Sequence, residues 1–324
     1  AKRKATNQKR HAGTVPQRRP KRGEVTCRAH CPTTRLQMKW AERIEDPNVW
    51  RIYRATVGLS VAYGMALSLL AIFLDAKGFT KSDIGSLALA FGLGIVTLSL
   101  VMDRLIERFG AKEMLVTCFF GYAATVIAFP FLDTFASIAA VRFLDGAFSV
   151  GIWIGSEAML LSRAGERNKA FTMSLYAVAI GIGYVVGPGL AWALTRVGPL
   201  SIGFVGAGLL AAAAGLYVIA RLERTKAKRQ VVSVEQIGRD VSPDPPEKLS
   251  RAGVLWKIKS SCFAAFAYGY FQASVVLFLP LYLIQSKGIA EGQTIWIPAF
   301  FAVGMLLFTN PAGLLGDRVG HLLG

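Results

Sequence analysis

Eight long apolar runs constrain the fold of this 324-residue chain more than any other feature. Each run is close to the roughly 20 residues that an α-helix needs to cross about 30 Å of hydrocarbon. Hydrophobic residues make up 53% of the chain and charged residues only 18%, a combination that is rare in soluble domains. We therefore expect an all-α membrane protein with about eight transmembrane helices. The runs cover residues 52–74, 84–102, 114–132, 137–161, 171–194, 200–220, 257–284 and 294–315.

The basic residues predict how these spans are oriented. A formal net charge of +17 would indicate nucleic-acid binding in a soluble protein, but 15 of the 37 Lys and Arg residues lie in residues 1–54 and 10 more in residues 221–259. Positive charge is retained on the cytoplasmic side of a membrane. We therefore expect a multi-pass protein with a cytoplasmic amino terminus and no nucleic-acid partner.

Composition divides the chain into four segments. Residues 1–49 are basic, have no apolar periodicity and should form a disordered cytoplasmic tail, unless the natural start is Met38 and the part before it is an upstream extension. Residues 50–222 hold six spans and should form a helical bundle. Residues 223–255 resemble a proline-containing cytoplasmic linker, and residues 256–324 hold two further spans.

An internal repeat relates the seventh span to the first. Lys77-Gly78 recurs as Lys287-Gly288, and the charged turn at 107–110 recurs at 317–320, in both cases after 210 residues. Transporters are often built from such structural repeats. If the first copy has six spans, the second should have six as well. We therefore expect the sequence to be a fragment of a twelve-span protein.

The fourth span carries three ionisable residues and is the main candidate for function. At about 100° per residue, one helix face gathers its polar side chains and the opposite face carries Gly151 and Gly155, a pair that permits close helix packing. A charge within a membrane costs roughly 2.5–3.5 kcal/mol, so the polar face should line a cavity. Its predicted cavity residues are Arg142, Asp145, Ser149, Trp153 and Glu157.

Two alternatives apply to these charges. Arg142 and Asp145 could simply pair with each other near the outer interface. Glu157 lies 15 residues from Arg142, about 22 Å along the helix, and so acts at another depth. It could bind a proton, or it could tether Arg163 or Arg167 at the inner interface.

Three polar residues on other spans are further cavity candidates: Tyr63, Tyr268 and Gln272. Tyr and Gln in membrane helices also complete hydrogen bonds between helices, which is the alternative for all three. No metal site is expected, because Cys27 and Cys31 around His30 have no second ligand pair at zinc-finger spacing.

The segment from Gly313 to Gly320 resembles the G-x-L-x-D-R-x-G signature of the major facilitator superfamily. In that family the signature acts at a helix end as a conformational latch; an ordinary turn with positive-inside charges is the alternative here. The first-half copy departs from the pattern, with Asp103 in place of the leading Gly and Glu107 in place of Asp. The signature positions are Asp103, Glu107, Arg108 and Gly110 in the first copy and Gly313, Asp317, Arg318 and Gly320 in the second.

Two further signatures support this resemblance. Arg142-x-x-x-Gly146 resembles a fourth-span motif that the family links to proton coupling. Gly183-x-x-x-Gly187-Pro188 resembles the fifth-span kink of its antiporters, although Ala191 stands where the motif has Gly. A glycine-rich packing helix is the alternative for this span.

The chain most resembles the bacterial YcaD-like branch of the family, in which the fourth span carries Arg142, Gly146, Trp153 and Glu157 in this order. The resemblance implies a major-facilitator-type bundle in the bacterial inner membrane, with eight of twelve helices present. It also implies a monomer that moves a small solute through a lipid bilayer by alternating access.

We expect a secondary active transporter that exports a small organic solute with proton coupling, because titratable groups lie within the spans. A carrier for uptake or facilitated diffusion is one alternative, and a membrane sensor or scaffold without transport is another. No phosphate-binding loop, catalytic triad or metal cluster occurs in the sequence, so neither an enzyme nor a cofactor is expected.

Overall fold

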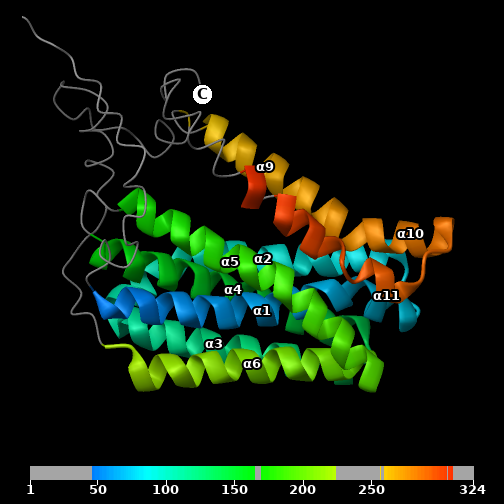
Figure 1. Ribbon diagram of the computed structural model, residues 1–324, viewed down its shortest axis with the longest axis horizontal. Coiled ribbons are helices and arrows are strands. Elements are labelled where there is room, and N and C mark those ends of the chain that lie inside the picture. The colour runs from blue at the N-terminus through cyan, green and yellow to red at the C-terminus, as the bar shows by residue number, and fades with distance from the viewer. Residues whose placement is uncertain (1–45, 165–168, 224–255, 257–258, 305, 309–324) are drawn as a thin grey trace, which may run out of the picture. The chain divides into compact units, whose positions relative to one another are not determined.

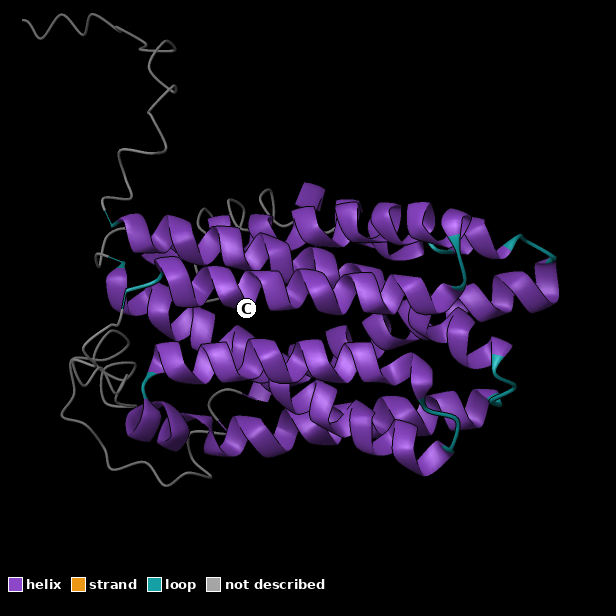
Figure 2. Ribbon diagram, turned by 90° about the horizontal axis from the view of Figure 1, so that it is seen from below, coloured by secondary structure: helices purple, strands orange, loops and turns teal. Residues whose placement is uncertain are grey.

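The computed structural model describes residues 46–164, 169–223, 256, 259–304 and 306–308. All elements in these residues are helical, which confirms the all-α prediction. Eight of the described helices are long and apolar enough to cross a membrane, in agreement with the eight predicted spans. The helices lie side by side with connecting loops at their two ends (Figure 2).

The first six spans form long helices whose ends lie close to those of the apolar runs. Short connections separate them, and the loop between the third and fourth helices follows a single 3-10 turn, η2 (Phe129–Phe131). The six helices are α1 (Pro47–Ala76), α2 (Lys81–Phe109), α3 (Ala111–Ala128), α4 (Phe135–Arg163), α5 (Lys169–Val197) and α6 (Leu200–Arg221).

Side-chain caps set where several helices begin. Asp46 precedes α1 and accepts a hydrogen bond from the backbone N–H of Asn48. Thr80 begins α2 with a reciprocal capping box to Asp83. Such caps satisfy N–H groups that have no partner within the helix. Between α2 and α3, Gly110 takes a φ of 95°, a conformation that other residues rarely adopt.

The bundle is organised around α1, which packs mainly on α5 and α6, while α2 packs on α4 and α3 packs on α4 and α6 (Figure 1). Glycines permit these close approaches. The predicted packing face of α4 lies against α3, with Gly151 beside Cys118 and Gly155 beside Leu115. Small residues of this kind let membrane helices pack closely, which matters because the hydrophobic effect does not drive helices together within lipid.

The seventh and eighth spans contain breaks. The seventh comprises α9 (Lys259–Ala273), a π-helical turn η4 (Ser274–Phe278) and α10 (Leu279–Lys287). The eighth candidate span covers Glu291–Phe308 and begins with the short helix α11 (Glu291–Thr294). Both η4 and α10 pack on α1.

The predicted repeat has a direct counterpart in the packing. Gln285 at the end of α10 donates a hydrogen bond of 2.9 Å to Asp75 at the end of α1. These residues are 210 positions apart, the same offset that relates Lys77-Gly78 to Lys287-Gly288. Equivalent ends of the first and seventh spans are therefore in contact.

Candidate functional site

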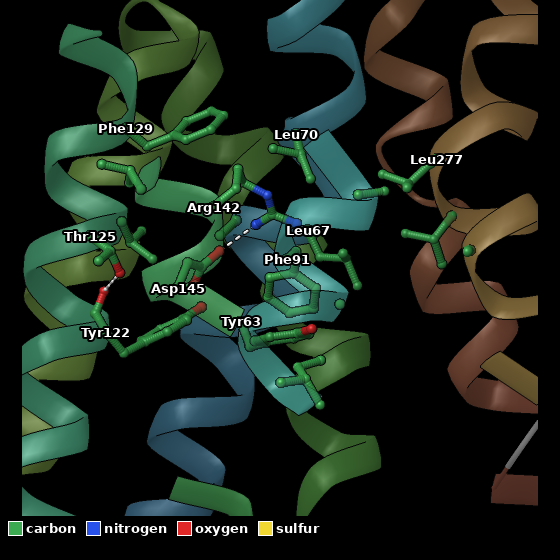
Figure 3. A pocket seen from close by; sticks show the side chains of 18 of the residues that line it. Tyr63, Leu67, Leu70, Phe91, Tyr122, Thr125, Phe129, Arg142, Asp145 and Leu277 are labelled. Carbon is green, nitrogen blue, oxygen red and sulfur yellow. Dashed lines mark hydrogen bonds and ion pairs between the residues drawn. The ribbon is translucent and has the colours of Figure 1, made fainter. Parts of the chain in front are cut away.

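Two cavities lie where the six-helix bundle meets α9, η4 and the eighth span. The larger has a volume of about 390 Å³ and a mainly apolar wall that includes five aromatic side chains. Figure 3 shows Leu277 of the seventh span across this cavity from Tyr122 and Thr125 of α3. The residues that line it include Tyr63, Leu67, Leu70, Phe91, Tyr122, Phe129, Arg142, Asp145, Phe204, Gln272 and Leu277.

Arg142 and Asp145 are the charged residues of this larger cavity, and they form an ion pair with each other. Their exposed fractions are only 8% and 7%. The Arg142 guanidinium also lies 4.3 Å from the centre of the Phe91 ring. Figure 3 shows it between Asp145 and the side chains of Leu67 and Leu70.

The pair does not satisfy all of its own polar atoms. Arg142 Nε and Asp145 Oδ1 are buried and have no hydrogen-bond partner within the described part of the chain. One is a donor and the other an acceptor. Such atoms are costly in an apolar environment. The wall of the cavity therefore holds a pair of charges that is neutral overall, with one donor and one acceptor buried without a partner behind it.

Close packing between α2 and α4 positions this pair. A Cβ on Gly146 would overlap the carbonyl oxygen of Phe91, and a Cβ on Gly94 would overlap that of Phe143. Since both glycines permit backbone contact, the Phe91 ring is brought beneath Arg142. Gly146 thus has a packing role in addition to its place in the sequence signature.

An aromatic cluster lies between the two cavities. The centre of the Tyr63 ring is 6.2 Å from that of Tyr122, 6.1 Å from that of Trp153 and 5.7 Å from that of Tyr184. Tyr63 and Tyr122 line the larger cavity, whereas Trp153 and Tyr184 line the smaller one. We call these four residues the aromatic partition.

The smaller cavity, of about 230 Å³, contains the second carboxylate. Glu157 is half-buried there beside Trp153. Arg163, which the sequence offered as a tether for Glu157, forms an ion pair of 2.7 Å with Asp46 instead. Arg167 lies outside the described residues. Gln272 of α9 lines both cavities.

The predicted polar face of α4 is thus divided between two compartments. Arg142 and Asp145 line one, Trp153 and Glu157 the other, and Ser149 lies buried with its hydroxyl donating to the carbonyl of Gly146. The side chain of Tyr268 lies outside the described residues. Phe91, Tyr122 and Tyr184 were not predicted, because an aromatic residue in an apolar run carries no periodic signal of its own.

A second polar cluster lies at the end of the bundle where α1 begins and α4 and α6 end. Arg51 pairs with Glu223 at 3.0 Å, and Asn48 joins Asp46 to Glu223. Arg163 pairs with Asp46. We call these five residues the rim cluster.

The electrostatics of the rim cluster favour its charged form. Partial burial alone would raise the pKa of Asp46, but hydrogen bonds from Arg163 and Asn48 outweigh it and hold that pKa below its usual range. Hydrogen bonds from Arg51 and Asn48 likewise lower the pKa of Glu223.

The other predicted motif residues lie outside both cavities. Asp103, Glu107 and Arg108 are exposed near the end of α2. Beside them, Lys112 donates hydrogen bonds to the carbonyls of Ile219 and Leu222 and so ties α3 to the end of α6. The second copy, Gly313, Asp317, Arg318 and Gly320, lies outside the described residues.

The predicted kink motif lies in a packing seam. Gly183 and Gly187 are buried against α1, where added Cβ atoms would meet Ser60 and Val61. Pro188 lies inside α5, which remains helical from Lys169 to Val197. In addition, no group of three His, Cys, Asp or Glu side chains that could hold a metal ion occurs among the described residues.

Comparison with known proteins connects this architecture to a family. The sequence profile of the Major Facilitator Superfamily matches residues 54–323. The uncharacterized MFS-type transporter YfkF of Bacillus subtilis (strain 168) is 21% identical over 262 residues, which are 80% of this chain and 63% of that protein. The uncharacterized MFS-type transporter YqjV of the same organism is 24% identical over 281 residues, 86% of this chain and 65% of that protein.

A shorter match covers part of a drug-resistance protein. The quinolone resistance protein NorA of Staphylococcus aureus (strain N315) is 23% identical over 134 residues, 41% of this chain and 34% of that protein. The chain spans about two thirds or less of the length of YfkF and YqjV. With the profile match over most of its length and eight apolar helices, the chain is a multi-pass membrane protein that belongs to the major facilitator superfamily.

Proposed function

We propose that this protein is a secondary active transporter that exports a small organic solute in exchange for protons, by alternating access. Its family and its similarity to MFS-type transporters support transport. The partial similarity to a quinolone resistance protein favours export.

The observation that carries the proposal is the division of two carboxylates between two cavities. Asp145 is held by Arg142 in the larger cavity. Glu157 lies in the smaller one and makes no ion pair within the described residues. Because a guanidinium stays protonated, the Arg142 pair suits solute binding, whereas Glu157 suits proton exchange.

The proposal includes an orientation and a location. The basic segments flanking the bundle favour a cytoplasmic location for the amino-terminal end of α1, by the positive-inside rule. The larger cavity then lies nearer the outer side and Glu157 nearer the cytoplasm, since α4 runs inward. We propose a monomer in a bacterial inner membrane, close to the YcaD-like branch.

The test is flux in proteoliposomes with an imposed pH gradient and a panel of labelled aromatic amides, carboxylates and amines. Glu157→Gln should abolish the response of transport to pH while solute binding persists. Arg142→Lys should impair binding and transport together, because Lys cannot reproduce the planar guanidinium. Asp133→Asn, which changes an exposed carboxylate outside both cavities, is the matched control.

Each alternative function has its own outcome. Flux that ignores the gradient in the wild-type protein would indicate facilitated diffusion or uptake. No flux for any solute would favour a membrane sensor or scaffold. An unchanged pH response in Glu157→Gln would remove this residue from coupling.

A further inference from the structure

We propose that the larger cavity selects planar aromatic molecules that carry no net charge and present a hydrogen-bond donor and acceptor side by side. This inference rests on the proposed transport function, because it names the solute class of the same site. It follows from the charge balance, the polar groups of the Arg142–Asp145 pair and the wall of the cavity.

The charge balance excludes strongly charged ligands. Of the residues that line the larger cavity, Arg142 and Asp145 carry charge, and they neutralise each other. Both are more than nine tenths buried. A ligand with a net charge would therefore enter an apolar space with no opposite charge left to balance it, which is unfavourable. A neutral molecule, or one with balanced charges, avoids this cost.

The polar groups of the Arg142–Asp145 pair define what the ligand must offer. Arg142 carries a guanidinium, which donates hydrogen bonds, and Asp145 carries a carboxylate, which accepts them, and both residues line the cavity. Because Arg142 Nη1 is joined to Asp145 Oδ2, the guanidinium and the carboxylate lie next to each other in the wall, and a ligand that meets both needs an acceptor and a donor close together. A carboxamide, with its carbonyl and N–H₂ on one carbon, meets this requirement.

The wall defines the body of the ligand. Phe91 already stacks beneath the guanidinium of Arg142, and Tyr63, Tyr122 and Phe129 also line the cavity. Aromatic rings bind one another in offset-stacked or edge-to-face arrangements. A volume of about 390 Å³ is within the range of sites for drug-sized molecules. Gln272 adds one neutral polar side chain from the seventh span.

Three probes with one naphthalene body separate the requirements. Naphthalene-2-carboxamide offers donor and acceptor without charge, 2-naphthoate offers only acceptors, and 2-naphthylmethylammonium offers only donors. Equilibrium dialysis against the purified full chain in lipid nanodiscs measures each Kd, and empty nanodiscs correct for partition into lipid. We expect the carboxamide to bind about tenfold more tightly than either charged probe.

Variants of the pair should change the order of affinity in opposite directions. Arg142→Gln leaves the carboxylate alone and should favour the ammonium probe. Asp145→Asn leaves the guanidinium alone and should favour naphthoate. Asp133→Asn, at an exposed carboxylate outside both cavities, should keep the wild-type order. Leu67→Trp should weaken the binding of all three probes without changing their order, because the larger side chain would occupy part of the cavity.

The result for the wild-type protein is decisive even if a variant does not stay monodisperse in size-exclusion chromatography. Tightest binding of a charged probe, or equal binding of all three, would overturn the proposal. Binding is measured without a gradient, so it is independent of coupling. The expected order of affinity together with flux that ignores pH would retain the solute class and reject proton exchange. Another order of affinity together with flux that responds to pH would reject the solute class and retain proton exchange.

Discussion

The Arg142–Asp145 pair and the rim cluster use the same ion-pair chemistry in different surroundings. The rim cluster joins α1, α4 and α6 through several partners, and Glu223 in it keeps a side-chain exposure of 69%. The side chains of Arg142 and Asp145 are each only 10% exposed, and each retains an unmet atom. Water can compensate charges at the rim but not inside the bundle. The rim cluster thus joins three helix ends through solvated contacts, whereas the inner pair is confined to one helix and lies in an apolar cavity.

The largest expected effect comes from breaking the inner pair on one side. Asp145→Leu leaves a buried guanidinium that cannot lose its proton, and should destabilise the protein by about 3–5 kcal/mol. Arg142→Met should cost less, because a carboxyl group left alone can accept a proton. Thermal unfolding in detergent measures both effects.

The double variant Arg142→Met/Asp145→Leu is the control for this prediction. Replacing both members of a buried ion pair with apolar residues is often neutral or stabilising. We expect it to recover most of the lost stability while losing the affinity for naphthalene-2-carboxamide. Additive losses from the two single changes would contradict the view that the pair serves binding more than stability.

The next effect concerns the close packing of α2 on α4, which places Phe91 beneath Arg142. Gly146→Ala forces a methyl group against the carbonyl of Phe91 and should cost about 1–3 kcal/mol, as overpacked sites do. Gly92→Ala is the matched control, because an added Cβ there meets no atom within 4 Å. Thermal unfolding should leave the control close to the wild type. Equal losses of stability in both variants would indicate that α2 and α4 do not tolerate any glycine-to-alanine change, whatever the space around it.

A smaller effect is expected at the rim, with a defined dependence on pH. Asp46→Asn keeps an N-cap for α1 but removes the charge that pairs with Arg163, at a cost of about 1 kcal/mol or less. Because the pKa of Asp46 is lowered in the folded state, its contribution is present above the unfolded pKa of about 4 and is lost as pH falls through the folded value.

The difference in melting temperature between the wild type and Asp46→Asn should therefore be constant from neutral pH to about pH 5 and should shrink below about pH 4. Scans at a series of pH values test this sign. A difference that grows as the pH falls would contradict the assignment of Asp46 as a charged partner in the folded protein.

The sequence predicted the elements better than it predicted the site. Apolar runs of about 20 residues are sufficient to locate membrane helices, because the bilayer imposes one length and one composition on all of them. The face of α4 was predicted from helical periodicity, and Gly151 and Gly155 do lie against α3. Its division into two cavities was not predictable, since it depends on Tyr63 and Tyr184 from other helices.

The Asp46–Arg163 contact could not be predicted from the sequence either. These residues are separated by 117 positions, and Asp46 precedes the first apolar run rather than lying in it. Local spacing therefore offered only Glu157 as a partner for Arg163. Contacts between helix ends depend on how the bundle closes, which periodicity within one helix does not encode.

The smallest expected effect is that of Glu223→Gln, which tests whether the rim cluster behaves as a solvated network. The carboxylate of Glu223 is paired with Arg51, but it is exposed, so its attraction should be screened by salt. The amide can still accept hydrogen bonds from Arg51 and Asn48, which limits the loss further. We expect a slight decrease in melting temperature at low ionic strength and no difference from the wild type at about 1 M salt, where the Debye length is about 3 Å. A loss that persists at high salt would show that the rim is shielded from solvent like the inner pair, and the contrast between the two regions would then be one of position rather than of hydration.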